Sequence, residues 1–499
     1  MESSNDSIWD VVLLNTFIIN KKKFKVYFHR QTLIWERETP PHSRTSLPVN
    51  DIIAVKYLHN SDESCCCNVD NGVESTHQVF TIHFVVQEKQ NQWKYKRVDL
   101  KSSDHRQVTT WVTTLDSMLT ELKHRPKHLL MFVNPFGGRK RGLRIYKEVV
   151  KPLMDIAGVK VDLTITQRPN HARDILLEDN LTEYDGVVCV GGDGTFSEIM
   201  NGLITRTARD DGVDPNNAAC DLPKPNLRVG IIPGGSTDTV AYCIHGTTDI
   251  QTAVIHIIIG ESAGLDVSSV HNQTTLLCYY ASVISYGYLG DIIRDSDNFR
   301  WMGPKRYDFS GMKKFLANQG YEVEIKLAVN SSKTEEDSKC LKDCKRCASQ
   351  KDLTSDDSSV QEWKVIQGKF LMVNGANLRC ACPRSPNGIS PYTHMGDGCL
   401  DVVLVKHTSI LNNLRLLLTL SSRLKSIYDL PFVDVHRTTQ FSVKAVSREA
   451  TDVSVWNCDG EVLVDTSIFI RAHCQLLQIF FRGVEPCLEE ENPRCFCFL

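Results

Sequence analysis

The 499-residue chain has no strong excess of charge of either sign, because 57 lysine and arginine residues are set against 60 aspartate and glutamate residues. A net charge of −3 gives no broad basic field, which argues against nucleic acid as a partner. The chain also lacks an apolar run of about 18 residues, the length that a membrane-spanning helix needs. Its first residues lack the basic and apolar regions of a secretory signal peptide. These absences predict a soluble protein of the cytoplasm.

Three familiar nucleotide-binding signatures are missing. The sequence has no Gly-x-x-x-x-Gly-Lys-Ser/Thr loop, and no Gly-x-Gly-x-x-Gly opens a helix with an acidic residue at the next strand end. The His-Arg-Asp and Asp-Phe-Gly signatures of protein kinases are missing too, and Asp308-Phe309-Ser310-Gly311 does not replace them. We therefore expect no P-loop site, no nicotinamide site and no protein kinase.

The 18 cysteines follow no paired framework, so without a secretory signal we expect mostly reduced thiols. One group has metal-ligand spacing: Cys340, Cys344 and Cys347 with Cys380 and Cys382 offer the soft ligands that Zn²⁺ binds. The first three also have the spacing of radical-enzyme iron–sulfur ligands, but they lie in a polar segment rather than after the first strand of a barrel. A zinc site and reduced thiols without metal remain the two alternatives.

Residues 1–124 are predicted to form a separate unit of short strands followed by one amphipathic helix at 104–123, in which Trp111 is central. The strands are predicted at 9–14, 24–28, 32–35, 52–57, 80–86 and 93–100. This order resembles a pleckstrin-homology domain. The basic residues of its first predicted hairpin lie where such domains contact anionic phospholipids, and a solvated hairpin tip is the alternative. They are Lys21, Lys22, Lys23, Lys25 and Arg30.

Residues 125–270 are predicted to form an α/β unit. It starts near Arg125-Pro126, because the residue before a proline is driven out of the helical conformation. Strands at 128–133, 159–166, 185–190 and 227–232 alternate with helices, which implies a parallel sheet that binds ligands at the carboxyl ends of its strands. The loops at those ends read Asn-Pro-Phe-Gly-Gly, Thr-Gln-Arg-Pro-Asn, Gly-Gly-Asp-Gly-Thr and Pro-Gly-Gly-Ser-Thr. Their convergence predicts a phosphate-binding crevice.

The loop that contains Asp193 has the strongest chemical signal. A buried strand, a glycine loop and the start of a helix near Thr195 form an anion site, because the first N–H groups of a helix have no internal partner. Asp193 is itself an anion at this place. A carboxylate here would hold a metal ion or take a proton from an attacking hydroxyl, and the alternative is a turn residue that caps the helix.

Residues 271–499 change to strands with few helices, which predicts an antiparallel β-sandwich packed on the α/β unit. The strands are predicted at 276–286, 323–329, 363–373, 401–406, 441–446, 462–470 and 475–481. The segment 330–361 is charged, rich in serine and poor in apolar residues, so a mobile insert is expected. The fold class is therefore multidomain, with a pleckstrin-homology-like domain, an α/β parallel-sheet domain and an all-β domain.

With Gly-Gly-Asp-Gly-Thr, Asn-Pro-Phe-Gly-Gly and Trp456-Asn457-Cys458-Asp459-Gly460-Glu461, residues 127–485 resemble the diacylglycerol-kinase catalytic superfamily. Within it the chain is similar to the ceramide kinases, which share the N-terminal unit, Arg306-Tyr307-Asp308-Phe309-Ser310-Gly311 and a like cysteine cluster. The resemblance implies transfer of the γ-phosphoryl group of ATP, with Mg²⁺, to the primary hydroxyl of ceramide, giving ceramide 1-phosphate. Sphingosine kinase, diacylglycerol kinase and a non-catalytic lipid-binding adaptor remain alternatives. An NAD kinase on the related fold is disfavoured by the N-terminal unit.

The resemblance also implies roles for single residues. Asp193 would be the general base, Gly191, Gly192 and Gly194 would shape the substrate pocket, and Asp291 would contact the lipid headgroup. The residues that would hold ATP come from six segments. They are Asn134, Pro135, Phe136, Gly137, Gly138, Thr166, Gln167, Arg168, Pro169, Asn170, Glu198, Gly235, Ser236, Thr237, Arg300, Arg306, Asp459, Gly460 and Glu461. Thr166 and Asn170 have a plainer alternative, as a strand end and a helix cap.

A basic amphipathic helix is predicted at 410–427. It places Leu411, Leu414, Leu417, Leu418 and Leu424 beside Arg415, Arg423 and Lys425. Such helices bind membranes or calmodulin, and a helix docked on its own domain is the plainer alternative. Ceramide kinases respond to calcium, so the resemblance adds calmodulin, and Ca²⁺ through it, as an expected partner. We expect a cytoplasmic protein that associates peripherally with the plasma membrane or the Golgi, where its ceramide substrate lies.

Overall fold

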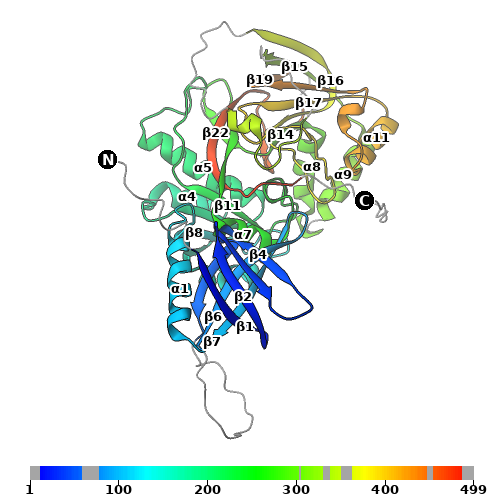
Figure 1. Ribbon diagram of the computed structural model, residues 1–499. Coiled ribbons are helices and arrows are strands. Elements are labelled where there is room, and N and C mark those ends of the chain that lie inside the picture. The colour runs from blue at the N-terminus through cyan, green and yellow to red at the C-terminus, as the bar shows by residue number, and fades with distance from the viewer. Residues whose placement is uncertain are drawn as a thin grey trace.

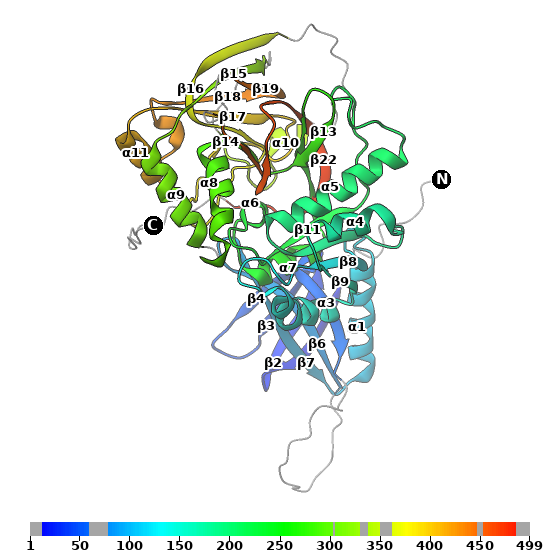
Figure 2. The ribbon, with the colours of Figure 1, turned by 180° about the vertical axis from the view of Figure 1, so that it is seen from behind.

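The computed structural model describes residues 12–58, 78–302, 305–329, 338–349, 362–446 and 453–485, without the side chain of Arg300. Figures 1 and 2 show a central α/β unit between an N-terminal antiparallel sheet and a C-terminal group of strands. The multidomain fold that the sequence predicts is thereby confirmed. In the described part of the chain, no helix combines the length and the apolar character that a membrane span requires.

The N-terminal unit is a seven-stranded antiparallel sheet in the order β4-β3-β2-β1-β7-β6-β5, closed by helix α1. Asp104 begins the helix by accepting hydrogen bonds from the N–H groups of Arg106 and Gln107, and Trp111 is buried against the sheet. This architecture confirms the pleckstrin-homology domain. Its elements are β1 (Leu13–Ile19), β2 (Lys22–His29), β3 (Thr32–Arg37), β4 (Arg44–Pro48), β5 (Ile52–Tyr57), β6 (Gln78–Lys89), β7 (Gln92–Ser102) and α1 (His105–Thr120).

Two strand predictions in this unit need correction. Residues 9–11 of the first predicted strand lie outside the described residues. Within them the strand β1 begins at Leu13 and continues past the predicted end at position 14 to Ile19, so that the side chains of Phe17 and Ile19 are buried in the core. Strand β4 was not predicted, because Arg-Thr-Ser-Leu-Pro is largely exposed at the edge of the sheet and has no clear alternation. The basic hairpin stands as predicted: Lys21 lies in the turn between β1 and β2, and Lys22, Lys23 and Lys25 are exposed on β2.

The α/β unit contains four parallel strands in the order β11-β10-β8-β9. All six residues of β10 are buried. Val187 and Cys189 pack with Phe196 of α5, whereas Val188 and Val190 pack on the opposite face with α7, so helices cover both faces. The elements are β8 (His128–Val133), β9 (Lys160–Ile165), β10 (Gly186–Gly191), β11 (Arg228–Pro233), α2 (Gly142–Ile145), the π-helical turn η2 (Tyr146–Val150), α3 (Lys151–Ala157), α4 (His171–Glu178), α5 (Asp193–Asp210), α6 (Thr239–His245) and α7 (Ile250–Ile259).

The C-terminal unit is built from antiparallel strands, as predicted, but it is continuous with the parallel sheet. Strand β22 pairs with β12 and β19, and its end lies parallel to β11 at Ile479 and Val229. The strands are β12 (Ser262–His271), β13 (Leu276–Tyr280), β14 (Val283–Gly287), β15 (Tyr321–Ala328), β16 (Trp363–Ala376), β17 (Leu400–Lys406), β18 (Val433–Thr438), β19 (Gln440–Ala445), β20 (Trp456–Cys458), β21 (Glu461–Leu463) and β22 (Ser467–Phe480).

Two predicted strand boundaries in this unit were wrong. The strand predicted at 276–286 is broken into β13 and β14, because the N–H groups of Ala281 and Ser282 donate to the carboxylate of Asp459 instead of to a neighbouring strand. The strands predicted at 462–470 and 475–481 are the short β21 and the long β22. Strand β22 passes through Gln475, whose φ of 48° marks the bend between the two units.

Helices and turns cover the outer side of the C-terminal unit: α8 (Tyr288–Ser296), η3 (Asp297–Met302), α9 (Lys305–Ala317), α10 (Lys345–Ser349), α11 (Ile410–Leu420) and η5 (Ile427–Asp429). The helix predicted at 410–427 ends at Leu420, because the Ser422 side chain then accepts hydrogen bonds from the N–H groups of Leu424 and Lys425. Of the predicted insert, residues 330–337 and 350–361 lie outside the described residues. Residues 338–349 pack on the body, where the N–H of Lys342 donates to the carbonyl of Val484.

The pleckstrin-homology domain packs directly on the α/β unit. Lys94 forms an ion pair with Asp249 at 2.9 Å, and the N–H of Trp93 donates to the hydroxyl of Thr252. The guanidinium of Arg482 lies 3.8 Å from the centre of the Trp93 ring. The basic hairpin is therefore carried on a domain that is anchored to the α/β unit through polar and ring contacts of β7 rather than tethered by a loose linker.

Candidate active site

The glycine loops at the carboxyl ends of β8, β10 and β11 touch one another through their backbones. A Cβ on Gly138 would lie 2.4 Å from the carbonyl oxygen of Gly235, and a Cβ on Gly235 would lie 2.6 Å from the Cα of Gly192. No side chain fits at these distances, so glycine is required by the contact itself. The structure thus brings the predicted loops together at one edge of the sheet.

Asn134 ties the first of these loops to the helix after the second. Its side-chain oxygen accepts hydrogen bonds from the N–H groups of Phe136 and Gly137, at 2.9 and 3.0 Å. Its side-chain nitrogen donates to the hydroxyl of Thr195 at 2.9 Å. Both ends of the Asn134 amide therefore take part in shaping the crevice, which makes Asn134 a positioning residue.

Asp193 is the first residue of α5, yet its carboxylate faces the start of a different helix, α6. The two oxygens accept hydrogen bonds from the N–H groups of Val240 and Thr239, at 2.8 and 3.1 Å. Burial raises the pKa of Asp193, and the two N–H donors oppose that rise. The sequence-based alternative of a helix cap is thus correct in kind, although the capped helix is α6. A cap on α6 and a base in the crevice are compatible, because each oxygen retains a second lone pair.

Two further carboxylates lie within the electrostatic reach of Asp193. Burial raises the pKa of Asp238 to about 6, and the charge of Asp193 adds to that rise. Burial likewise raises the pKa of Asp459 to about 6, again with a contribution from Asp193. The partners of Asp459 are backbone N–H groups, those of Ala281 and Val283 at 2.9 and 3.0 Å. The charge of Asp193 therefore acts on both neighbouring carboxylates, a pattern of shifted pKa values that is typical of functional sites.

The β20–β21 hairpin delivers Asp459 to this cluster from the C-terminal unit. Its turn needs positive φ at both central residues, 46° at Asp459 and 97° at Gly460, as an Asp-Gly hairpin allows. Burial raises the pKa of Glu198, and the charge of Glu461 contributes, so Glu461 faces the same region. Asp459 and Glu461 thus lie within electrostatic reach of Asp193 and Glu198, and the ATP-binding role predicted for this motif stays a prediction.

The loop after β9 is held by the α/β unit itself. Thr166 is buried and donates from its hydroxyl to the carbonyl of Val133, which matches the strand-end alternative. Glu198 accepts from the N–H of Ala172 at the start of α4, so its carboxylate serves a helix N-terminus. Asn170 precedes α4 with a φ of 60° and makes no side-chain cap. Gln167 and Arg168 are exposed beside Pro169, and Arg168 pairs with Asp174 at 2.6 Å.

Ser236 and Thr237 are exposed in the turn between β11 and α6, and Gly194 is the one loop glycine at which a Cβ would meet nothing within 4 Å. Gly194 is itself exposed, so the start of α5 beside Asp193 borders solvent. Pro135 and the 63 % exposed Phe136 lie at the outer rim of the same crevice.

Asp291 and Arg306 have partners within the C-terminal unit. Asp291 is buried on α8 and accepts from the hydroxyl of Ser454 at 2.8 Å, from Arg294 at 2.9 Å and from the hydroxyl of Tyr321. Arg306 donates to the hydroxyl of Tyr307 at 2.6 Å and lies 3.6 Å from Asp297. The structure therefore places both residues in a different neighbourhood from the glycine loops, and their ligand roles stay predictions. The side chain of Arg300 is outside the described part.

Asp238 is the residue that sequence reasoning missed. Its side chain accepts from the N–H of Gly235 at 2.8 Å, and its φ is 54°. The sequence did offer a signal, because Asp238 directly follows Pro-Gly-Gly-Ser-Thr at the start of a helix. Asp193 occupies the same kind of position, after a glycine loop and at the start of a helix.

Comparison with known proteins places this site in a class. The family model of the diacylglycerol kinase catalytic domain matches residues 128–270, which hold every glycine loop described above. The models of the ceramide kinase pleckstrin-homology domain and of the ceramide kinase C-terminal domain match residues 13–115 and 282–498. The class is therefore that of proteins with a diacylglycerol-kinase catalytic fold.

Relatives along nearly the whole chain narrow this class. The chain is 39% identical to a ceramide kinase of Mus musculus, over 91% of this chain and 94% of that protein, and 39% identical to one of Homo sapiens, over 93% and 94%. It is 31% identical to ceramide kinase 1 of Caenorhabditis elegans, over 80% and 74%. The chain belongs to the ceramide kinase family.

Proposed function

We propose that the protein is an ATP-dependent lipid kinase that transfers the γ-phosphoryl group to the primary hydroxyl of ceramide and gives ceramide 1-phosphate. The observation that carries the proposal is the half-buried carboxylate of Asp193, which lies at the start of α5 among the glycine loops of a chain that matches ceramide kinases along its length. A non-catalytic adaptor would have no use for this carboxylate beside a phosphate-type crevice.

Phosphoryl transfer depends on positioning and on charge stabilisation rather than on covalent help from the protein. In the proposed reaction Asp193 takes the proton of the ceramide hydroxyl as the hydroxyl oxygen bonds to the γ-phosphorus. The bond from phosphorus to the bridging oxygen breaks, and ADP leaves with the electron pair. Burial supports this role, because the raised pKa of Asp193 makes the carboxylate a stronger proton acceptor than an exposed aspartate.

The carboxylates around Asp193 favour Mg²⁺, which prefers carboxylate oxygen. Among the described residues, the oxygens of Asp193, Asp238 and Asp459 do not converge as the ligand atoms of a closed metal site do. Mg²⁺ would therefore be held by one or two of these carboxylates together with the phosphates of ATP. When bound, Mg²⁺ would neutralise charge on the phosphates of ATP. The loops around Gly138, Gly192 and Gly235 would present backbone N–H groups to the same phosphates.

The acceptor is tested by offering ceramide, sphingosine and diacylglycerol side by side in the same mixed micelles, with purified protein, Mg²⁺ and labelled ATP. Ceramide should be phosphorylated at least about tenfold faster than the others, because a site that fits a neutral amide rejects the charged amine of sphingosine. Comparable transfer to sphingosine would overturn the acceptor and keep the lipid kinase. Transfer to none of the three would favour the adaptor.

The N-terminal unit serves membrane recruitment in this proposal. Exposed Lys21, Lys22 and Lys23 sit at one hairpin, on a domain that is fixed to the catalytic unit. Each basic residue near an anionic surface contributes about 1 kcal/mol, so changing all three to glutamine should weaken binding to phosphatidylserine vesicles by about 100-fold. Vesicle co-sedimentation measures this. The matched control changes three exposed lysines of the α/β unit, Lys147, Lys160 and Lys224, and should leave binding within a few-fold.

Calmodulin is the second partner that we propose, at α11. Leu411 and Leu418 are 77% and 65% exposed, whereas Leu416 is buried, so the helix presents part of its leucine stripe outward. Exposed Arg415 lies on the same helix, and basic apolar faces of this kind suit the acidic groove of calmodulin. Calcium-loaded calmodulin added to the acceptor assay should change turnover, and Leu418→Glu should remove that response.

A further inference from the structure

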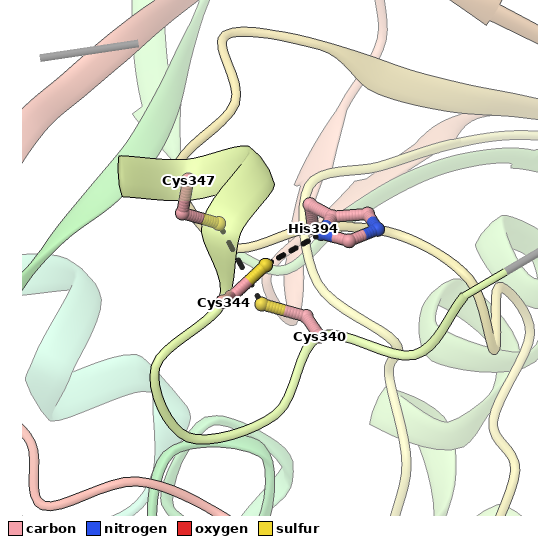
Figure 3. Close-up of side chains that lie close together, drawn as sticks. All are labelled: Cys340, Cys344, Cys347 and His394. Carbon is pink, nitrogen blue, oxygen red and sulfur yellow. Dashed lines mark hydrogen bonds between the residues drawn. The ribbon is translucent and has the colours of Figure 1, made fainter. Parts of the chain in front are cut away.

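Three cysteines and one histidine converge outside the candidate active site. The thiol sulfurs of Cys340, Cys344 and Cys347 and one ring nitrogen of His394 all lie within 4.8 Å of one another. Figure 3 shows the four side chains pointing toward a common centre, three from the segment that ends in α10 and one from the loop before β17. The sequence alone had suggested the three cysteines, and the histidine is new.

The other two cysteines of the sequence-based zinc hypothesis belong elsewhere. The thiol of Cys380 is directed at the carbonyl of Leu378, at 3.1 Å, and Cys382 forms a backbone bridge with Ser385. Neither belongs to the group around His394. The expected ligand pair Cys380 and Cys382 was therefore wrong, because a short Cys-x-Cys spacing carries no information about which distant segment it will meet.

The spacing of the four atoms suits a tetrahedral ion. With bonds of about 2.3 Å to sulfur and about 2.0–2.1 Å to nitrogen, a tetrahedral Zn²⁺ sets sulfur–sulfur distances near 3.8 Å and sulfur–nitrogen distances near 3.6 Å. Here the sulfurs of Cys340 and Cys347 are 3.7 Å apart, and Cys344 Sγ lies 3.2 Å from His394 Nδ1. A disulfide would need about 2.05 Å, so the cysteines are separate thiols.

Hydrogen bonds from neighbouring backbone groups orient two of the four ligands in the way that metal sites require. The Nε2 of His394 lies 3.1 Å from the carbonyl of Ser338, which can only accept, so Nε2 carries the proton and Nδ1 keeps its lone pair toward the sulfurs. The N–H of Met395 donates to the sulfur of Cys340 at 3.5 Å, a contact that stabilises a thiolate. Both arrangements would be unnecessary for a group of unligated thiols.

We propose that Cys340, Cys344, Cys347 and His394 bind one structural Zn²⁺. Four protein ligands leave no open position, so the ion has no catalytic water. On binding, the three thiols lose their protons to solvent and the imidazole stays neutral. The site is separate from the proposed Mg²⁺ site, whose donors are carboxylates.

The ion would reinforce a polar segment that is otherwise held by polar contacts, among them the Arg346–Asp397 ion pair at 2.8 Å and the hydrogen bond from the Gln475 side chain to the carbonyl of Cys347. Residues 338–349 contain one leucine among their lysines, serines and cysteines, so they bury almost no apolar area of their own. Cys340 and Met395 line one small hollow together with Cys243 of α6. The first N–H groups of α6 donate to Asp193, the general base of the proposed function. An ion that fixes the segment beside α6 would therefore help to hold Asp193 in position.

Metal content of the purified full-length protein tests the proposal without any kinase assay. We expect about one zinc per chain by elemental mass spectrometry after purification without chelators. Cys347→Ser and His394→Ala should each lose most of it, whereas His394→Cys, which restores a fourth soft ligand, should keep it. Cys382→Ser is the matched control and should keep the full content, because Cys382 lies outside the group.

Because some of these variants could fail to fold, a second measurement uses the wild-type protein. Exchange of Zn²⁺ for Co²⁺ should give the absorption spectrum of tetrahedral cobalt with thiolate ligands, and chelation should expose residues 338–349 to protease. A wild-type chain that holds no zinc and takes up neither ion would overturn the proposal, as would zinc that survives in His394→Ala or is lost in Cys382→Ser. Each of these results is independent of whether ceramide is the acceptor.

Discussion

Asp193→Asn is expected to lower turnover of ceramide by about 10²–10⁴-fold, the usual contribution of a general base, while ATP binding survives. Asparagine keeps the size of the side chain and one acceptor for the N–H groups of Val240 and Thr239, but it cannot take the proton of the hydroxyl. Turnover is measured over a Mg²⁺ titration, and nucleotide affinity is measured separately by fluorescence.

Asp266→Asn is the matched control for Asp193→Asn. Asp266 is fully buried, whereas Asp193 is half-buried, and each oxygen of Asp266 likewise accepts one backbone N–H, from Gln475 and from Gly398, both at 2.7 Å. The two variants therefore lose the same kind of hydrogen bond, which costs about 1 kcal/mol of stability. Only the Asp193 variant should lose the chemical step, and the control should stay within a few-fold of the wild-type turnover.

The acid limb of the pH profile gives an independent reading of Asp193. Because burial raises its pKa, the wild-type base is protonated, and turnover falls, at a higher pH than an ordinary aspartate would require. The residual activity of Asp193→Asn should not show this fall. Recovery of the variant at high Mg²⁺ would instead make Asp193 mainly a metal ligand, and near-normal turnover at ordinary Mg²⁺ would remove it from the mechanism.

Gly138→Ala is expected to raise the KM for ATP by at least about tenfold, equivalent to about 1.4 kcal/mol. Its Cβ would lie 2.4 Å from the carbonyl of Gly235, so one of the two loops must move away from the other. The residue also has a φ of 54°, which costs alanine about 1 kcal/mol in addition. Steady-state kinetics at saturating ceramide measure the change.

Gly158→Ala is the control that separates the effect of the contact between the Gly138 and Gly235 loops from the effect of alanine at a positive φ. Gly158 has a φ of 69° at the end of α3, and a Cβ there would meet nothing within 4 Å. This control should lose thermal stability to a similar extent and keep the KM for ATP. If both variants leave the KM unchanged, the contact between the loops of Gly138 and Gly235 is not what shapes the nucleotide site.

The parts of this protein that the sequence determined are those encoded over a few neighbouring residues. Helix α1 follows from Asp104 and the spacing of Val108, Trp111 and Leu115, which face the sheet within one helix. The loop around Asp193 follows in the same way, because a buried strand, a glycine turn and a helix start are consecutive in the chain. Local patterns of this kind depend on φ/ψ preferences and on side-chain periodicity, both of which are read directly from the sequence.

The tertiary structure alone decided which distant residues meet. Asp459 reaches the charge of Asp193 because the β20–β21 hairpin turns back over the break between β13 and β14. His394, rather than Cys380 or Cys382, joins the three cysteines because the loop before β17 is held to β12, where the N–H of Asp266 donates to the carbonyl of Met395. No local spacing encodes such meetings, since the path of the chain between two segments is set by the packing of everything that lies between them.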